Sequence, residues 1–236
     1  MKLSDPASSA ACPEFLVYTA CLPFEDAVVI ELGCGRAEHT RAIASTYPRA
    51  RITAFDVDQV QYELNRSAVN PRNLRFELGG AEAIAAGDDG ADIVMMLKSL
   101  HHVSSGLLDR ALREMRRVLR PGGLAYISEP VFAGELNEIV RIFHDEQQAR
   151  LDAFAALQRA VVNRSLELVE QRFFLAPVYY RDFAEFERDV IRATHSNHRL
   201  SAVQVENVRE RFLNHVGPDG AIFNMPTRVD LLRKPG

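Results

Sequence analysis

Two glycines and an aspartate near the start of the chain have the spacing of a cofactor site. Gly33 and Gly35 follow an apolar run at 27–32 and precede a helical pattern that begins at Glu38. A strand, a glycine loop and a helix in this order let the backbone approach a ligand and leave amide groups to bind it. Asp56 ends the next apolar run, where a carboxylate can accept hydrogen bonds from a ribose diol. Together these residues predict a site for an adenosine-containing cofactor.

Acidic residues around this loop distinguish between possible cofactors. Glu31 lies two residues before Gly33, and Glu38 stands where a dinucleotide-binding fingerprint has its third glycine. A pyrophosphate would meet two carboxylates here, whereas a sulfonium and an ammonium group would be attracted to Glu31. The charges therefore favour S-adenosylmethionine over NAD.

The elements that must hold these residues are short apolar runs alternating with helical stretches. This alternation is typical of βαβ units around a parallel sheet. The pattern predicts strands over 27–32, 51–55, 73–78, 91–97 and 123–129, with helices over 13–21, 38–45, 60–69 and 107–119.

The pattern changes after Glu129. Apolar residues at mostly helical spacing over 134–170 predict one long helix or a pair of helices. A strand over 173–180, helices over 182–194 and 201–216, and a last strand over 221–232 follow. No repeat or low-complexity linker interrupts the chain. We therefore expect one domain over 1–236, in which residues 134–216 include a helical cap.

Several short segments resemble motifs of the S-adenosylmethionine-dependent methyltransferases with a Rossmann-like seven-stranded sheet. They are VVIELGCG at 28–35, AFDVD at 54–58, ADIV at 91–94, LHHV at 100–103 and RPGG at 120–123. The resemblance covers about residues 25–130. It implies a three-layer α/β fold with a doubly wound sheet of order 3-2-1-4-5-7-6, an antiparallel last strand and the helical cap. It also implies S-adenosylmethionine as the cofactor.

The sequence departs from the family pattern at two positions. Ala37 stands where the family often has glycine, and Gly80 stands where it commonly has an aspartate near the adenine amino group. Adenine would then contact the backbone of Gly80 and Ala81, or the side chain of Glu82. Lys98 ends the fourth strand beside the expected methionine moiety, and Tyr18 is placed to close over the cofactor. The predicted cofactor-binding residues are Glu31, Gly33, Cys34, Gly35, Asp56, Val57, Gly80, Ala81, Glu82, Lys98 and Tyr18.

Three residues at the ends of the fourth and fifth strands are candidates for catalysis. Methyl transfer is an in-line displacement that depends mainly on positioning, so it does not require a general base. His101 and His102 titrate near neutral pH, although the resemblance also implies a helix-positioning role for them. Glu129 ends the fifth strand at the carboxyl edge, where open α/β sheets bind ligands, and is predicted to face the acceptor.

Composition narrows the range of partners. With 28 basic and 32 acidic residues the net charge is −4, and the arginines at 110–120 alternate with acidic residues, so we expect no nucleic-acid partner.

Three cysteines without a C-x-x-C pair or zinc-ligand spacing predict no bound metal and a reducing, cytoplasmic location. The apolar runs are too short for a membrane span. Oligomeric state is left open.

The predicted function is S-adenosylmethionine-dependent methyl transfer to a small-molecule acceptor. Methylation of a macromolecule, or transfer of another alkyl group from a sulfonium, is an alternative. The chain lacks an Asn/Asp-Pro-Pro-Tyr motif after the fourth strand, which argues against N-methylation of nucleobases or glutamine amides. A different alternative is a non-catalytic regulatory protein that binds the cofactor. The acceptor and the type of atom methylated are not predicted.

Overall fold

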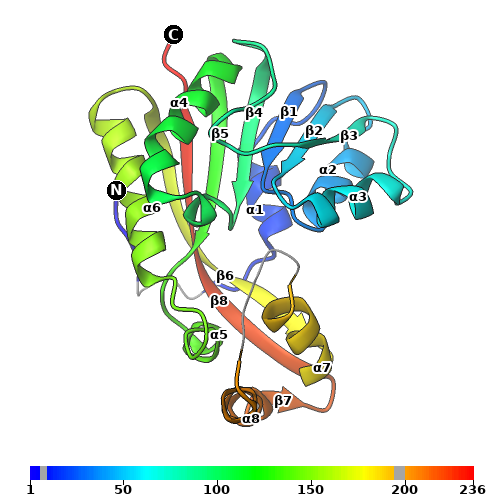
Figure 1. Cartoon of the computed structure of the whole chain (residues 1–236). Coiled ribbons are helices and arrows are strands. Elements are labelled where there is room, and N and C mark those ends of the chain that lie inside the picture. The colour runs from blue at the N-terminus through cyan, green and yellow to red at the C-terminus, as the bar shows by residue number, and fades with distance from the viewer. Residues whose placement is uncertain (6–9, 194–199) are drawn as a thin grey trace.

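The computed structural model describes residues 1–5, 10–193 and 200–236. Its central sheet has the strand order β3-β2-β1-β4-β5-β8-β6, and the short β7 pairs with β8 (Figure 1). The predicted order is confirmed, with β8 in the place of the seventh strand. The strands are β1 (Val28–Leu32), β2 (Arg51–Asp56), β3 (Leu74–Leu78), β4 (Ala91–Leu97), β5 (Leu119–Pro130), β6 (Glu167–Tyr180), β7 (Val216–Gly217) and β8 (Gly220–Arg233).

Strand direction sets where the site can form. β1 pairs in parallel with β2 and β4, β2 with β3, and β4 with β5. The long β8 runs antiparallel to both β5 and β6, as expected for the last strand. The carboxyl ends of β1 to β5 therefore meet at one edge of the sheet, which is where ligands bind in such folds.

Helices cover both faces of the sheet. α4 (Leu108–Val118) and α6 (Gln147–Val162) lie on one face, where Met115 and Leu157 are fully buried in the core (Figure 1). α1 (Glu14–Cys21), α2 (Glu38–Thr46) and α3 (Gln59–Ser67) lie on the other, with Tyr18 and Ile43 in a second apolar cluster. The strands between are buried on both faces, which explains their continuous apolar runs.

A smaller lobe extends from one end of the sheet (Figure 1). It consists of α5 (Glu135–Val140), α7 (Phe183–Phe186), the π-helical turn η3 (Glu187–Ile191) and α8 (Ala202–Leu213), packed around the ends of β6 and β8. Phe186, Phe212 and Phe223 are fully buried at its centre. This lobe has its own apolar cluster and corresponds to the expected cap.

The range 134–216 therefore contains two kinds of structure. α6 and most of β6 belong to the main layers, whereas the other helices form the lobe. The predicted helical pair is α5 and α6. The end of the helix predicted over 182–194 lies outside the described residues. Organisation as a single domain stays a prediction.

Two strands begin earlier than their sequence patterns indicate. β5 starts at Leu119 because the RPGG segment is a bulge within it, where the register with β4 shifts. β6 starts at Glu167 because its pairing with β8 extends as far as Arg233.

None of the described helices is both long and apolar enough to cross a bilayer.

Candidate cofactor-binding site

A cavity of about 770 Å³ opens at the carboxyl edge of the sheet. The loop after β1, the end of β2, the segment after β3 and the end of β4 form its walls, as expected for a doubly wound sheet. The predicted site residues that line it are Gly33, Cys34, Gly35, Asp56, Val57, Gly80, Ala81, Glu82, Lys98 and His102. Residues far apart in the sequence thus form one concave surface.

The glycine loop is held against both neighbouring strands. Gly33 has φ +70, and a Cβ atom there would lie 2.7 Å from the Cβ atom of Ser99, so only glycine fits. The amides of Gly33 and Cys34 donate to the Phe55 carbonyl at 2.8 and 3.0 Å. Gly35 has φ +51, and apart from its chain neighbours no atom of the described residues lies within 4 Å of its ideal Cβ position. The loop is thus closely packed at Gly33 and open at Gly35.

Asp56 connects this loop to β2. Its Oδ2 accepts a hydrogen bond from the Gly35 amide at 2.7 Å, and its Oδ1 accepts one from the Asp58 amide at 2.9 Å. The side chain is 9% exposed and lines the cavity. Asp56 thus orders the loop, and recognition of a ribose by the same carboxylate stays a prediction.

Glu82 occupies the space next to Gly80. A Cβ atom on Gly80 would collide with the carboxylate of Glu82, so this carboxylate lies almost where a side chain at position 80 would be. Both residues line the cavity. The Glu82 side chain is therefore available for the adenine contact, as is the backbone of Gly80 and Ala81. Its contact with a cofactor stays a prediction.

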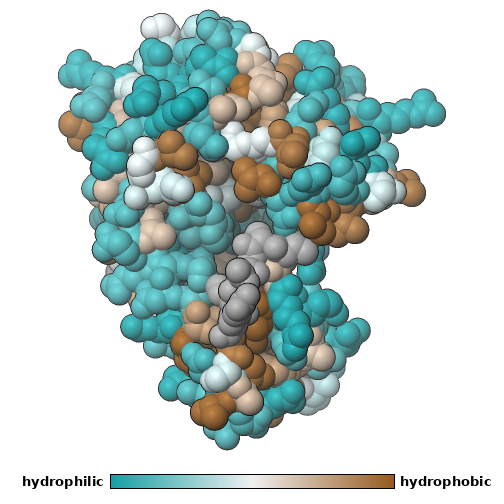
Figure 2. Space-filling view, viewed as in Figure 1, coloured by the Kyte–Doolittle hydropathy of each residue, from teal (hydrophilic) through white to brown (hydrophobic). Residues whose placement is uncertain are grey.

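Apolar side chains form the rim near α3. Val57 lines the cavity and is 70% exposed, and Val60 and Leu64 on α3 are 58% and 55% exposed. Figure 2 shows hydrophobic side chains gathered over this part of the surface. Val57 therefore presents an apolar side chain to the cavity, whereas Val60 and Leu64 lie outside its lining.

Lys98 is ion-paired at the end of β4. Its ammonium group contacts the carboxylate of Glu14 on α1, which also accepts a hydrogen bond from the Ser128 hydroxyl. Glu14 is only 5% exposed. This pair fixes Lys98 on the cavity wall, whereas a freely solvated lysine would not be held there. The sequence analysis did not identify Glu14.

Two predicted residues, Glu31 and Tyr18, do not line the cavity. Tyr18 is fully buried, with its hydroxyl 3.3 Å from Nδ1 of His39 and its ring edge-on to Phe24 and Tyr126. Glu31 is 3% exposed, and its Oε2 accepts a hydrogen bond from the Thr40 hydroxyl at 2.5 Å. Tyr18 points from α1 into the core under the loop, and Glu31 points there from β1, so both residues are buried.

Burial of Glu31 makes protein stability depend on pH. Removal from water is the main effect that raises the pKa of Glu31, to about 7 from an ordinary 4.5, and the nearby Glu14 adds to it. The folded chain therefore binds this proton more tightly than the unfolded chain does. The resulting stabilisation is present below about pH 4.5 and is lost as the pH rises to about 7.

The Glu31→Gln variant is therefore expected to be more stable than the wild type at pH 8, by up to roughly 3 kcal/mol. Glutamine has the same shape and can still accept the hydrogen bond from Thr40. Urea unfolding from pH 4 to pH 8 measures the effect, and the two proteins should converge at pH 4. Glu77→Gln removes the same charge from an exposed position on β3 and serves as the control. A stability difference that is the same at every pH would contradict this explanation.

His101 and Glu129 are joined behind the cavity wall. Nδ1 of His101 lies 2.5 Å from Oε2 of Glu129, whose Oε1 accepts a hydrogen bond from the Leu100 amide at 2.9 Å. Nε2 of His101 lies 3.4 Å from Glu146, the residue before α6. Burial alone would lower the pKa of His101, but the two carboxylates outweigh it and raise the pKa to about 9. These contacts fix the turn η1 (Leu100–His102) against β5 and α6.

The three predicted catalytic residues thus lie in different surroundings. His102 lines the main cavity and His101 is buried behind it. Glu129 is 2% exposed and borders a second cavity of about 330 Å³, together with Arg150 and Arg228. Catalytic roles for all three stay predictions.

The smaller lobe also contributes to the main cavity. Arg188, Asp189, Arg192 and Ala193 line it, and Asp189 forms an ion pair of 2.6 Å with Arg36 in the glycine loop. This pair joins residues 153 positions apart. No local motif indicates such a contact, so sequence reasoning did not identify it.

Comparison with known proteins finds methyltransferases that are similar to part of this chain. Residues 29–123 match a family model described as a methyltransferase domain. The methyltransferase GfsG of Streptomyces halstedii is 30% identical over 146 residues, which are 60% of this chain and 48% of that protein. A ubiquinone/menaquinone biosynthesis C-methyltransferase UbiE of Hahella chejuensis is 29% identical, over 50% of this chain and 48% of its own. The chain thus matches about half the length of these relatives.

Solved structures agree on the fold. The crystal structure of YcgJ from Bacillus subtilis has a TM-score of 0.61 and 18% identity, covering 94% of this chain and 97% of its own. A putative methyltransferase from Bacillus halodurans has a TM-score of 0.61 and 16% identity, with the same coverage. Fold and site define a doubly wound α/β protein with a ligand cavity at its carboxyl edge. Residues 29–123 thus match a methyltransferase domain, and the solved structures share the Rossmann-like fold that the motifs predict.

Proposed function

We propose that the chain transfers a methyl group from S-adenosylmethionine to a small-molecule acceptor. The observation that carries this proposal is the 770 Å³ cavity, in which the glycine loop, Asp56 and Glu82 lie around one space. Its volume is within the range of small-molecule sites, roughly 300 to 1,000 Å³. The family match supports methyl transfer as the reaction.

The residues present fit this cofactor. Gly35 leaves room for a ligand against the loop, where a side chain would fill the space. Asp56 would accept hydrogen bonds from a ribose diol, and Glu82 would accept one from the adenine amino group. Lys98, held by Glu14, would lie at the methionine end. When bound, the cofactor supplies an electrophilic methyl group on a sulfonium.

A small acceptor is favoured over nucleic acid or a membrane. Among the arginines of α4 and the following bulge, Arg117 pairs with Asp88 and Glu114, and Arg120 pairs with Asp92, which reduces the positive charge of this surface. The UbiE relative is named for quinone biosynthesis, which supports a small organic acceptor. Free thiols at all three cysteines support a reducing location such as the cytoplasm.

The non-catalytic alternative loses its main support. It was suggested by Gly80, which lacks the carboxylate expected near adenine. The carboxylate of Glu82 lies next to Gly80 and would supply an acidic group there, which supports a catalytic protein over this alternative.

Mass spectrometry and calorimetry test the proposal. Freshly purified protein is measured under native conditions for bound S-adenosylmethionine or S-adenosylhomocysteine, and the ligand-free protein is then titrated with each compound and with NAD. We expect binding of both adenosyl compounds and none of NAD. Binding of NAD without binding of either adenosyl compound would overturn the proposed cofactor.

A further inference from the structure

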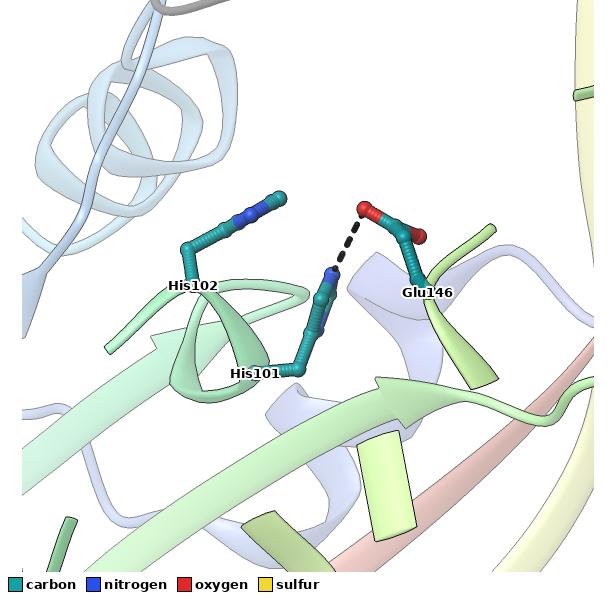
Figure 3. Close-up of side chains that lie close together, drawn as sticks. All are labelled: His101, His102 and Glu146. Carbon is teal, nitrogen blue, oxygen red and sulfur yellow. Dashed lines mark ion pairs between the residues drawn. The ribbon is translucent and has the colours of Figure 1, made fainter. Parts of the chain in front are cut away.

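Three metal-ligating side chains converge beside the main cavity. His101 and His102 come from the turn η1, and Glu146 comes from the start of α6. One donor atom from each lies within 4.8 Å of the other two. Figure 3 shows both rings and the carboxylate turned toward a shared space. The fold thus assembles a group that has no metal-ligand spacing in the sequence.

The spacing within this cluster fits a transition-metal ion. Nε2 of His101 and Oε1 of Glu146 are 3.4 Å apart. Two ligand atoms at about 2.1 Å from a tetrahedral zinc ion are separated by roughly 3.4 Å. Nε2 of His144 lies 2.9 Å from the same Glu146 oxygen, which brings another imidazole to the edge of the cluster. The three donor atoms lie within 4.8 Å of one another, so the exposed His102 ring would move inward by up to about 1.4 Å for one ion to bind all three.

The ligands are held by a second layer of hydrogen bonds. Nδ1 of His101 faces Glu129, which leaves Nε2 directed to the shared space. Arg150 donates to Oε2 of Glu146 at 2.6 Å, so Oε1 is the oxygen that would bind the ion, in place of its contacts with His101 and His144. A carboxylate behind a ligating histidine is a common arrangement in metal sites, because it fixes the ring and increases its basicity. The carboxylates of Glu129 and Glu146 also supply negative charge around a cation.

The cluster opens toward the cavity. His101 and Glu146 are 6% and 9% exposed, whereas His102 is exposed and lines the cavity. Three protein ligands with one open position are typical of catalytic zinc sites, in contrast to the four ligands of structural sites. An ion held here would thus have its open position on the side where the acceptor enters.

We propose that His101, His102 and Glu146 bind one divalent transition-metal ion, with Zn²⁺ the best match to the donor set. The ion takes the place of a proton on Nε2 of His101. Its open position accepts an oxygen or nitrogen donor of the acceptor, which makes the acceptor a small molecule with a metal-binding group. This last step rests on the proposed function, whereas the metal site itself does not.

Cobalt binding provides the test, because tetrahedral Co²⁺ has strong visible absorption. Chelator-treated protein is titrated with Co²⁺, and Zn²⁺ is then added to displace it. We expect one equivalent of Co²⁺ with a tetrahedral spectrum. His102→Gln and Glu146→Gln should each weaken binding at least about 100-fold, more than the loss of an outer hydrogen-bond partner. His215→Gln, in the smaller lobe near Glu135, is the matched control and should bind as the wild type does.

The outcomes separate this proposal from the proposed function. Circular dichroism confirms that each variant is folded, and calorimetry with S-adenosylhomocysteine reports the cofactor site independently. Absence of a tetrahedral Co²⁺ spectrum, or equal binding by folded His102→Gln and Glu146→Gln, overturns the metal site. If Co²⁺ binds as expected but S-adenosylhomocysteine does not, the proposed cofactor is wrong and the metal site stands.

Discussion

Gly35→Val is expected to abolish cofactor binding in a protein that remains folded. Apart from its chain neighbours, no atom of the described residues lies within 4 Å of the ideal Cβ position at Gly35, and Gly35 lines the cavity, so a valine side chain would take up space at the cavity wall. There it would take the space that a ligand needs against the loop. The φ of +51 adds a backbone cost of roughly 1 to 2 kcal/mol for a residue with a Cβ atom. A loss of affinity for S-adenosylhomocysteine of more than about 100-fold, measured by calorimetry, is the expected result.

Gly122→Val is a matched control for this substitution. Gly122 has φ +78 and only the tip of Arg120 within 4 Å of its Cβ position, but it lies in the β5 bulge outside the cavity lining. It should lose similar stability and retain cofactor affinity. Gly33→Ala should act differently, because its methyl group would clash with Ser99 and disturb the loop itself. Tight binding by folded Gly35→Val would show that the ligand lies elsewhere.

The fold could be predicted largely from local patterns. β4 has the predicted bounds because its run of apolar residues is buried on both faces of a parallel sheet. The bounds of β5 and β6 were less accurate, since a bulge and a long antiparallel pairing extend these strands beyond their apolar runs. The sequence also could not show which helices form the cap. Helical spacing does not distinguish α6, which packs on the sheet, from α8, which packs in the lobe.

The cofactor site was predictable where its residues follow strand ends in short motifs. Gly33, Gly35 and Asp56 line the cavity for this reason. Contacts between distant segments were not predictable, as the pairs Arg36–Asp189 and Lys98–Glu14 illustrate. They depend on how the lobe and α1 pack on the sheet.

The consequences of two departures from the family motif, at Ala37 and Gly80, became clear only from the structure. Ala37 adopts φ 57, a left-handed conformation that explains why the family often has glycine at this position. Gly80 indicated a missing carboxylate, yet Glu82 two residues later places its own in nearly the same space. A comparison of single positions with the family motif therefore misses a carboxylate that a neighbouring residue brings to the same place.

Asp56→Ala is the second variant with a large expected effect, a loss of cofactor affinity of about 2 to 5 kcal/mol. Two causes contribute. The carboxylate is placed to accept charge-assisted hydrogen bonds from the ribose, and it also accepts hydrogen bonds from the amides of Gly35 and Asp58. Calorimetry with S-adenosylhomocysteine measures the sum, and an unchanged affinity would contradict both roles.

A ligand with one hydroxyl fewer separates the two causes. The wild type should prefer S-adenosylhomocysteine over its 2′-deoxy analogue by roughly tenfold to 100-fold, the contribution of one hydrogen bond to a charged group. If Asp56 binds the ribose, Asp56→Ala will bind both compounds with nearly equal, weak affinity. If Asp56 only orders the loop, both affinities will fall and the preference will persist. Asp58→Ala removes a cap contact to Val60 and Gln61 on α3, so it should lower stability by about 1 kcal/mol and keep the preference. Asp56 contacts the loop through hydrogen bonds from the Gly35 and Asp58 amides, so loss of the preference in Asp56→Ala, with the preference kept in Asp58→Ala, indicates a contact between Asp56 and the ligand.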